Sequence, residues 1–76
     1  MTDIRRKILE VLTSSFPRYM KKEELRQNIR LNDLELNREI LYLGEEGCID
    51  LERDSELSFN LVKINFYGAR ALSNTQ

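Results

Sequence analysis

The sequence predicts an α+β domain in which three helices precede a β-hairpin and a short C-terminal helical turn. Apolar residues recur at the three- and four-residue spacing of a helix face through the first half of the chain. After residue 48 they alternate with polar residues, as in a half-buried strand. A chain of 76 residues has the size of one domain, with expected bounds of 1–72 and a disordered tail at 73–76.

The first helix is expected to begin after Thr2, whose hydroxyl is a suitable cap, and to end near Ser14. It should stop there because Pro17 pushes the residue before it out of the helical conformation. Residues 18–20 then form a short extended link. The apolar face of this helix consists of Ile4, Ile8, Val11 and Leu12.

A short second helix is expected over residues 21–29, and a third begins after Asn32. The third helix has a capping box, because Glu35 stands three residues after Asn32 and its side chain can reach back to the Asn32 backbone amide. Gly47 should end it in a left-handed conformation. Its buried face is expected to hold Leu36, Ile40 and Leu43.

Two strands and a short helical turn complete the expected order. Residues 49–52 alternate as a half-buried strand, and residues 58–64 offer a second strand after the turn at 53–56. Together they predict a hairpin. Asn65 is a suitable cap for a last helical turn over 68–72.

The composition is that of an ordinary globular protein, with 41% hydrophobic and 33% charged residues. No apolar run reaches the roughly 18 residues that a membrane span needs, so we expect a cytoplasmic protein without a membrane partner. The single cysteine, Cys48, has no histidine in the chain to activate it and is interpreted as an apolar filler. The sequence therefore predicts no enzyme, no catalytic residue, no cofactor or metal, and no small-molecule substrate.

The order of elements and several residues resemble small prokaryotic, especially archaeal, winged helix-turn-helix proteins of the transcription-regulator kind. The resemblance covers roughly residues 3–72. It rests on Glu23-Glu24-Leu25, Leu31, Leu36, Ile40, Tyr42-Leu43, Gly47, Ile49 and Leu61-Val62-Lys63-Ile64 ahead of Gly68. It implies that the third helix enters the major groove of DNA and that the hairpin contacts the backbone.

Three positions depart from the pattern that this resemblance implies. Lys21 stands where such proteins often have a Ser or Thr cap. Arg30 stands where the turn often has glycine, which predicts a left-handed backbone at Arg30. Gly44 falls inside the third helix, where close packing against a neighbour is the favoured explanation and a functional hinge is the alternative.

The charge distribution argues against DNA binding by the third helix. Residues 1–30 hold eight basic and four acidic side chains, whereas residues 31–56 hold two basic and nine acidic ones. The pI of the sequence is about 5.4. Non-specific affinity for DNA comes mainly from cations that displace counterions at phosphates, so the segment expected to approach DNA has the wrong sign of charge. This objection would not hold if the acidic side chains pointed away from the DNA groove. The side chains expected to face DNA in that case are Lys21, Lys22, Arg26, Asn37, Arg38 and Arg53.

The outward face of the third helix suggests a second function. Leu34 and Leu41 are seven residues apart and share one stripe with Arg38, and Tyr42 lies beside them. Exposed leucines suit a protein partner better than base edges, and Tyr and Arg are enriched at interface hot spots. The alternative is that one leucine is covered by the second helix or by the C-terminal tail. The residues expected to contact a partner are Leu34, Arg38, Leu41, Tyr42 and, from the second strand, Phe59.

Two functions are therefore expected from the sequence. The resemblance favours a DNA-binding protein, a transcriptional regulator that acts by non-catalytic binding to double-stranded DNA. The alternative is a winged helix used for protein association, either as a homodimer or as a docking module for another protein.

Overall fold

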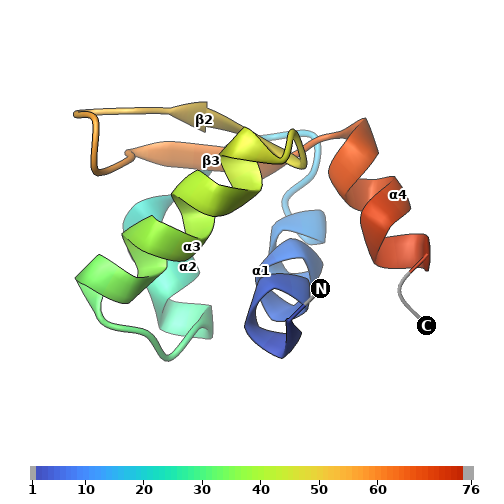
Figure 1. Cartoon of the computed structure of the whole chain (residues 1–76), viewed down its shortest axis with the longest axis horizontal. Helices are drawn as coiled ribbons and strands as arrows, with labels where there is room; N and C mark the ends of the chain where they lie inside the picture. Colours follow the sequence, from blue (N-terminus) through green and yellow to red (C-terminus); the bar gives the residue numbers. More distant parts are fainter. Residues whose placement is uncertain (1, 75–76) are drawn as a thin grey trace.

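The computed structural model describes residues 2–74 and confirms the predicted α+β class. Within these residues, helices and strands follow one another as α1 (Asp3–Thr13), β1 (Met20–Lys21), α2 (Lys22–Asn28), α3 (Asp33–Glu45), β2 (Ile49–Glu52), β3 (Leu61–Ile64) and α4 (Phe66–Asn74). The sheet forms one layer and α1, α2 and α3 form the other, while α4 packs at one end against α1 and β3 (Figure 1). None of the helices in this part of the chain has the length and apolar character needed to cross a membrane.

The sheet is antiparallel, with the strand order β1-β3-β2. Val62 on the central strand β3 pairs with Met20 of β1 and with Leu51 of β2. The strand β1 was not expected, because its two residues are too short to show an alternating pattern. The second hairpin strand is shorter than the expected 58–64, since β3 begins at Leu61, although the Asn60 amide still donates to the Glu52 carbonyl oxygen at 2.8 Å.

The helix caps predicted from the sequence are confirmed. The Thr2 hydroxyl oxygen accepts a hydrogen bond from the Arg5 backbone amide. The Asn32 side chain accepts from the Glu35 amide at 2.8 Å, and the Glu35 carboxylate accepts from the Asn32 amide at 3.4 Å. Gly47 has a φ of 79°, as expected for the residue that ends α3.

The left-handed backbone predicted for Arg30 is wrong, because no non-glycine residue in the described chain has a positive φ. Ile29 ends α2 in an extended conformation instead, and the chain turns into α3 without a left-handed residue at that point. A glycine is therefore not needed in this turn.

One hydrophobic core lies between the sheet and the helices. It includes the whole predicted face of α3 and residues of α2, the strands and Phe59. Of the predicted α1 face, Ile8 and Leu12 belong to the core while Ile4 and Val11 are partly buried against it, and Leu9, which was not assigned to that face, is fully buried. The fully buried residues of greatest volume are Phe59, Ile8, Leu9, Leu12, Leu25, Leu36, Ile40, Leu43, Ile64 and Val62. Burial of these side chains is the main stabilising contribution in a domain of this size.

The two glycines within helices mark places where neighbouring elements approach closely. A Cβ added at Gly44 would lie 2.9 Å from Cδ1 of Leu51 on β2, which supports close packing as the reason for this glycine. A Cβ at Gly68 would overlap the carbonyl oxygen of Cys48 and lie 2.8 Å from Cγ1 of Ile64. Docking of α4 on the start of β2 therefore requires glycine at position 68.

The last helix is longer than the predicted turn. Asn65 caps it as expected, since its side-chain oxygen accepts from the Gly68 amide at 2.9 Å. The helix then continues to Asn74, so residues 73 and 74 are helical and do not belong to the expected tail. The remainder of that tail, residues 75 and 76, lies outside the described residues.

Candidate functional site

An apolar groove lies between α3 and the loop that joins β2 to β3. Its volume is about 350 Å³. We refer to it as the α3–hairpin groove. It is lined by Leu34, Asn37, Arg38, Leu41, Tyr42, Glu45 and Leu57.

Helical periodicity brings the outward residues of α3 to this groove as the sequence predicted. Leu34 is 68% exposed, and Arg38 and Tyr42 are also exposed. Leu41 lines the groove and is half-buried. The predicted stripe is therefore a continuous wall formed by one face of the helix.

Leu57 forms the opposite side of the groove and was missed by the sequence analysis. It is 77% exposed, the largest exposed fraction among the big apolar side chains described. It follows the acidic turn at residues 53–56, and its position against α3 depends on how the loop folds back. The one signal in the sequence is an isolated leucine among polar residues.

Phe59 does not contact a partner, and its inclusion among the partner-binding residues is wrong. Its side chain is fully buried. Phe59 was expected within a second strand over residues 58–64, but it lies outside β3 and its ring is part of the core. The two aromatic or apolar residues of this loop thus have opposite positions: Leu57 lies on the surface and Phe59 lies inside.

Asn37 is buried rather than free to face nucleic acid. Its side-chain amide donates to Oδ2 of Asp33 at 3.3 Å. Its Oδ1 has no hydrogen-bond partner within residues 2–74. A buried oxygen without a donor lowers stability, so this asparagine beneath the α3–hairpin groove is not explained by packing alone.

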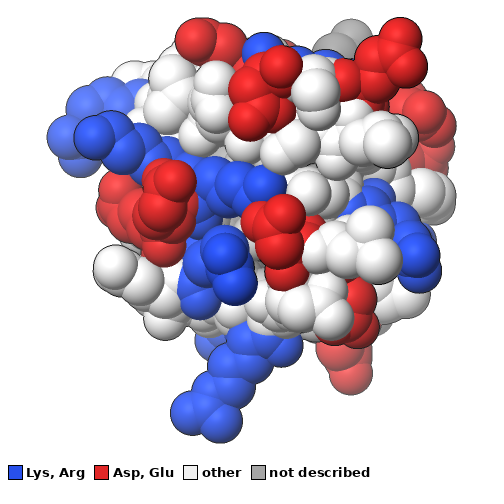
Figure 2. Space-filling view, turned by 90° about the vertical axis from the view of Figure 1, so that its left-hand side faces the viewer, with Lys and Arg blue, Asp and Glu red and all other residues white. Residues whose placement is uncertain are grey.

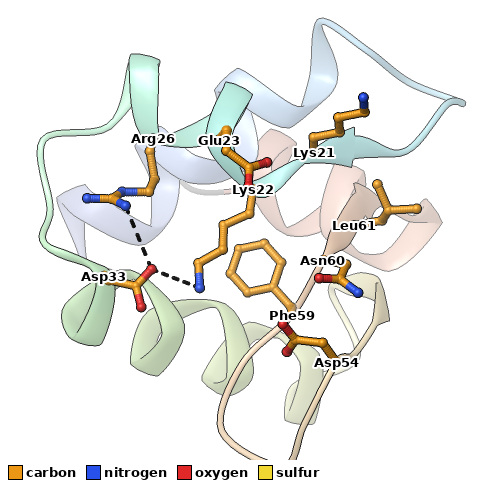
Figure 3. Close-up of a pocket in the computed structure, with 9 residues that line it drawn as sticks. All are labelled: Lys21, Lys22, Glu23, Arg26, Asp33, Asp54, Phe59, Asn60 and Leu61. Atoms are coloured by element: carbon orange, nitrogen blue, oxygen red, sulfur yellow. Dashed lines mark ion pairs between the residues drawn. The ribbon is translucent and has the colours of Figure 1, made fainter.

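A second hollow, of about 400 Å³, lies between α2 and the hairpin and gathers several of the predicted cations (Figure 3). Lys22 is the most enclosed of them: its Nζ lies 2.8 Å from Oδ1 of Asp33 and 3.0 Å from Oγ of Ser58. It also lies 5.3 Å from the centre of the Phe59 ring. Only 14% of the Lys22 side chain is exposed, so this lysine neutralises a carboxylate of its own chain.

The remaining predicted cations are more accessible. A guanidinium nitrogen of Arg26 lies 3.9 Å from Oδ1 of Asp33 (Figure 3), and Arg53 donates to the backbone oxygen of Glu56 at 3.3 Å. Lys21 and Arg38 are exposed and form no ion pair with any residue between 2 and 74. On the face that carries the hairpin tip, basic and acidic groups are interspersed and no continuous basic surface forms (Figure 2).

The ion pair with Lys22 predicts a pH-dependent stability. The hydrogen bond from Lys22 holds the pKa of Asp33 below its ordinary value, with smaller contributions from the Lys22 and Arg26 charges. A carboxyl group whose pKa is lower in the folded state stabilises the fold above its unfolded pKa, about 4, and this contribution is lost as the pH falls through the lowered value.

We therefore expect Asp33→Asn to be less stable than the wild type at pH 7 and to differ from it less at pH 2. Urea unfolding of both proteins, followed by circular dichroism at the two pH values, measures this difference. A gap in unfolding free energy that is the same at both pH values would contradict the ion pair as its source. Asp3→Asn, which changes another first-turn aspartate that has no ion pair among the described residues, is the matched control.

One acidic residue of α3 has a structural partner in α1. The Arg5 Nε donates to both carboxylate oxygens of Glu39, at 3.3 and 3.1 Å, and the Arg5 guanidinium lies 3.6 Å from the centre of the Tyr42 ring. This arrangement fixes Tyr42 at the edge of the groove. It also accounts for one of the negative charges that the sequence left unexplained.

The environment of the single cysteine does not favour a reactive thiol. Cys48 is buried, and burial raises the pKa of its thiol, with a smaller contribution from Glu46, which disfavours the reactive thiolate. Within residues 2–74, no group of three or more histidine, cysteine, aspartate or glutamate residues is arranged to hold a metal ion. The candidate site is therefore described by its shape, its apolar lining and its charges.

Comparison with known proteins adds no relative: no protein-family model, no curated protein and no solved structure matches this chain.

Proposed function

We propose that the chain is a winged helix-turn-helix domain whose α3–hairpin groove binds a protein partner. The order of elements supports the winged helix, with β1 placed between α1 and α2 and paired to the hairpin strand β3. In this assignment α2 and α3 are the helix-turn-helix and the β2–β3 hairpin is the wing. The groove then lies between the recognition helix and the wing.

The observation that carries protein binding is the apolar lining of this groove. Leu34 and Leu57 come from separate parts of the chain and are the two most exposed leucines described, yet they line one concave surface. Tyr42 and Arg38 at its edge are residue types enriched at protein interfaces. A contiguous apolar surface rimmed by polar groups is typical of an interaction site.

The charges support a protein over DNA as the occupant. Lys22 is already paired with Asp33, and the turn of the hairpin carries Asp54 and Glu56 against Arg53. Phosphates would meet nearly as many carboxylates as cations on this face. A protein partner needs no net positive surface.

Photo-crosslinking in cells tests the proposal. A benzophenone amino acid at position 57 is expected to form a covalent adduct with protein, because the side chain at this position lines the groove. The additional change Leu34→Glu should abolish the adduct, since it places a carboxylate in the apolar lining while leaving an exposed first-turn position of α3 compatible with the fold.

The same amino acid at position 10 is the control, because Glu10 is exposed on α1 away from the groove lining. Absence of a protein adduct at position 57, or an equal yield at both positions, would overturn protein binding by the groove.

Duplex DNA is the second candidate, because Arg38 projects from the proposed recognition helix without a carboxylate partner within residues 2–74. Fluorescence anisotropy with mixed-sequence duplexes at low salt tests it. DNA binding requires an affinity that falls steeply with salt and that is lost in Arg38→Glu and Lys21→Glu. If the anisotropy of the duplex does not change when the protein is added at low salt, sequence-independent binding to DNA is excluded.

A further inference from the structure

The exposed large apolar side chains fall into two sets at different ends of the molecule. Leu34, Tyr42 and Leu57 belong to the α3–hairpin groove. The others lie where α1 leads into β1 and where β3 leads into α4. This second set, which we call the aromatic end, consists of Phe16, Tyr19, Phe66 and Tyr67.

The sheet register brings the two parts of the aromatic end together. Met20 pairs with Val62 in an antiparallel ladder, so the preceding Tyr19 approaches Lys63, and the Lys63 Nζ lies 5.0 Å from the centre of the Tyr19 ring. Phe66 follows two residues after β3. The link after α1 and the start of α4 lie at the same end of the sheet (Figure 1).

Basic residues lie in the same segments of the chain as these aromatic residues. Arg18 is exposed beside Tyr19, and Arg70 is exposed one helical turn after Phe66. Lys63 has one carboxylate near it, Asp50, at 4.0 Å. A second identical aromatic end would bring like charges together, so this surface favours an acidic apolar partner.

The α3–hairpin groove of the same protein has that chemistry. Its lining carries Glu45 and Arg38, and the adjacent turn carries Asp54 and Glu56 against Arg53, so carboxylates outnumber cations by three to two. Leu34 and Leu57 supply apolar surface that rings can cover. Charge and apolar character are thus complementary between the two ends of one chain.

We infer that the partner of the α3–hairpin groove is the aromatic end of a second copy of this chain. The inference rests on the proposed function of the groove and names its occupant. The hairpin tip and α4 lie at opposite ends of the long axis (Figure 1), so one copy offers a groove at one end and an aromatic end at the other. Such head-to-tail contacts extend into an open row of molecules, with an unoccupied groove at one end of the row and an unoccupied aromatic end at the other.

The test uses two matched double variants that remove apolar surface without changing charge. The groove variant is Leu34→Ser with Leu57→Ser, and the aromatic-end variant is Phe66→Ser with Tyr67→Ser. All four side chains are at least two-thirds exposed, between 68% and 77%, so both proteins are expected to keep the wild-type circular dichroism spectrum.

Sedimentation velocity then compares the variants alone and mixed. We expect the wild-type average mass to rise with concentration and to fall toward the monomer with added salt, because the contact is partly ionic. Each variant alone should remain monomeric, since every contact would include an altered end. An equimolar mixture should form dimers and nothing larger, because one intact groove meets one intact aromatic end.

Three results would overturn the inference. If the wild type stays monomeric at millimolar concentration, the groove does not bind a second copy of the chain. A covalent adduct with a different protein at position 57 would then still support protein binding by the groove. Assembly of the aromatic-end variant alone would indicate a contact between two grooves. If the protein is monomeric and binds a labelled oligothymidine, and the aromatic-end variant does not bind it, the aromatic end binds single-stranded nucleic acid and not the groove of a second copy.

Discussion

Replacing Gly68 by alanine is expected to lower the free energy of unfolding by about 3 kcal/mol, at the upper end of overpacking costs. The added methyl group would overlap the backbone carbonyl oxygen of Cys48 and crowd Ile64, so α4 must move away from the sheet. The most severe overlap is with backbone atoms of Cys48, which cannot shift as the end of a flexible side chain can. Urea unfolding monitored by circular dichroism measures the loss.

Gly44→Ala is the matched control for this prediction. Its methyl group would meet Cδ1 of Leu51 at 2.9 Å, and this atom is the end of a side chain that can shift. The gain in helix propensity, about 1 kcal/mol, offsets part of the strain. Similar unfolding free energies for the two alanine variants would contradict the close docking of α4 at position 68.

Phe59→Ala is expected to cost about 4 kcal/mol of unfolding free energy, whereas Leu57→Ala should change it by less than about 0.5 kcal/mol. Phe59 is fully buried and Leu57 is the most exposed leucine described, although only Ser58 lies between them. Removal of the ring leaves a cavity in the core. Thermal and urea unfolding of the two variants measure the difference.

The same pair separates stability from association. Leu57→Ala should weaken the concentration-dependent rise in mass without changing the unfolding midpoint, because its side chain lines the α3–hairpin groove. Phe59→Leu, a smaller change in the core, should lower the midpoint and leave association intact in the folded fraction. A loss of association in Phe59→Leu with no loss in Leu57→Ala would contradict the assignment of the two residues.

Local signals in the sequence predicted the helices well because the contacts behind them are close along the chain. Asn32 and Glu35 satisfy each other's backbone amides within one turn, so the start of α3 can be recognised from four residues. Gly47 ends the same helix by its own conformation. The outward face of α3 follows from periodicity alone, which is why Leu34 and Tyr42 were identified correctly as exposed.

Contacts between distant parts of the chain were not predictable in this way. The two residues of β1 are a strand only because β3 lies beside them. Residues 59 and 60 lie outside β3, and Phe59 is buried together with Val62 and Ile64, so alternation counted along the hairpin does not predict the burial of Phe59. The position of Leu57 beside α3 and the contact of Lys22 with Asp33 both depend on the tertiary structure. Neither can be inferred from composition or from the spacing of residues along the chain.

The Lys22–Asp33 ion pair has a consequence for any anion that approaches the hollow between α2 and the hairpin. The Asp33 carboxylate already lies between Lys22 and Arg26, tethered to the same chain. A tethered group competes as if it were present at a high effective concentration, on the order of millimolar or more. A free phosphate that entered this hollow would therefore compete with Asp33 for the ammonium group of Lys22.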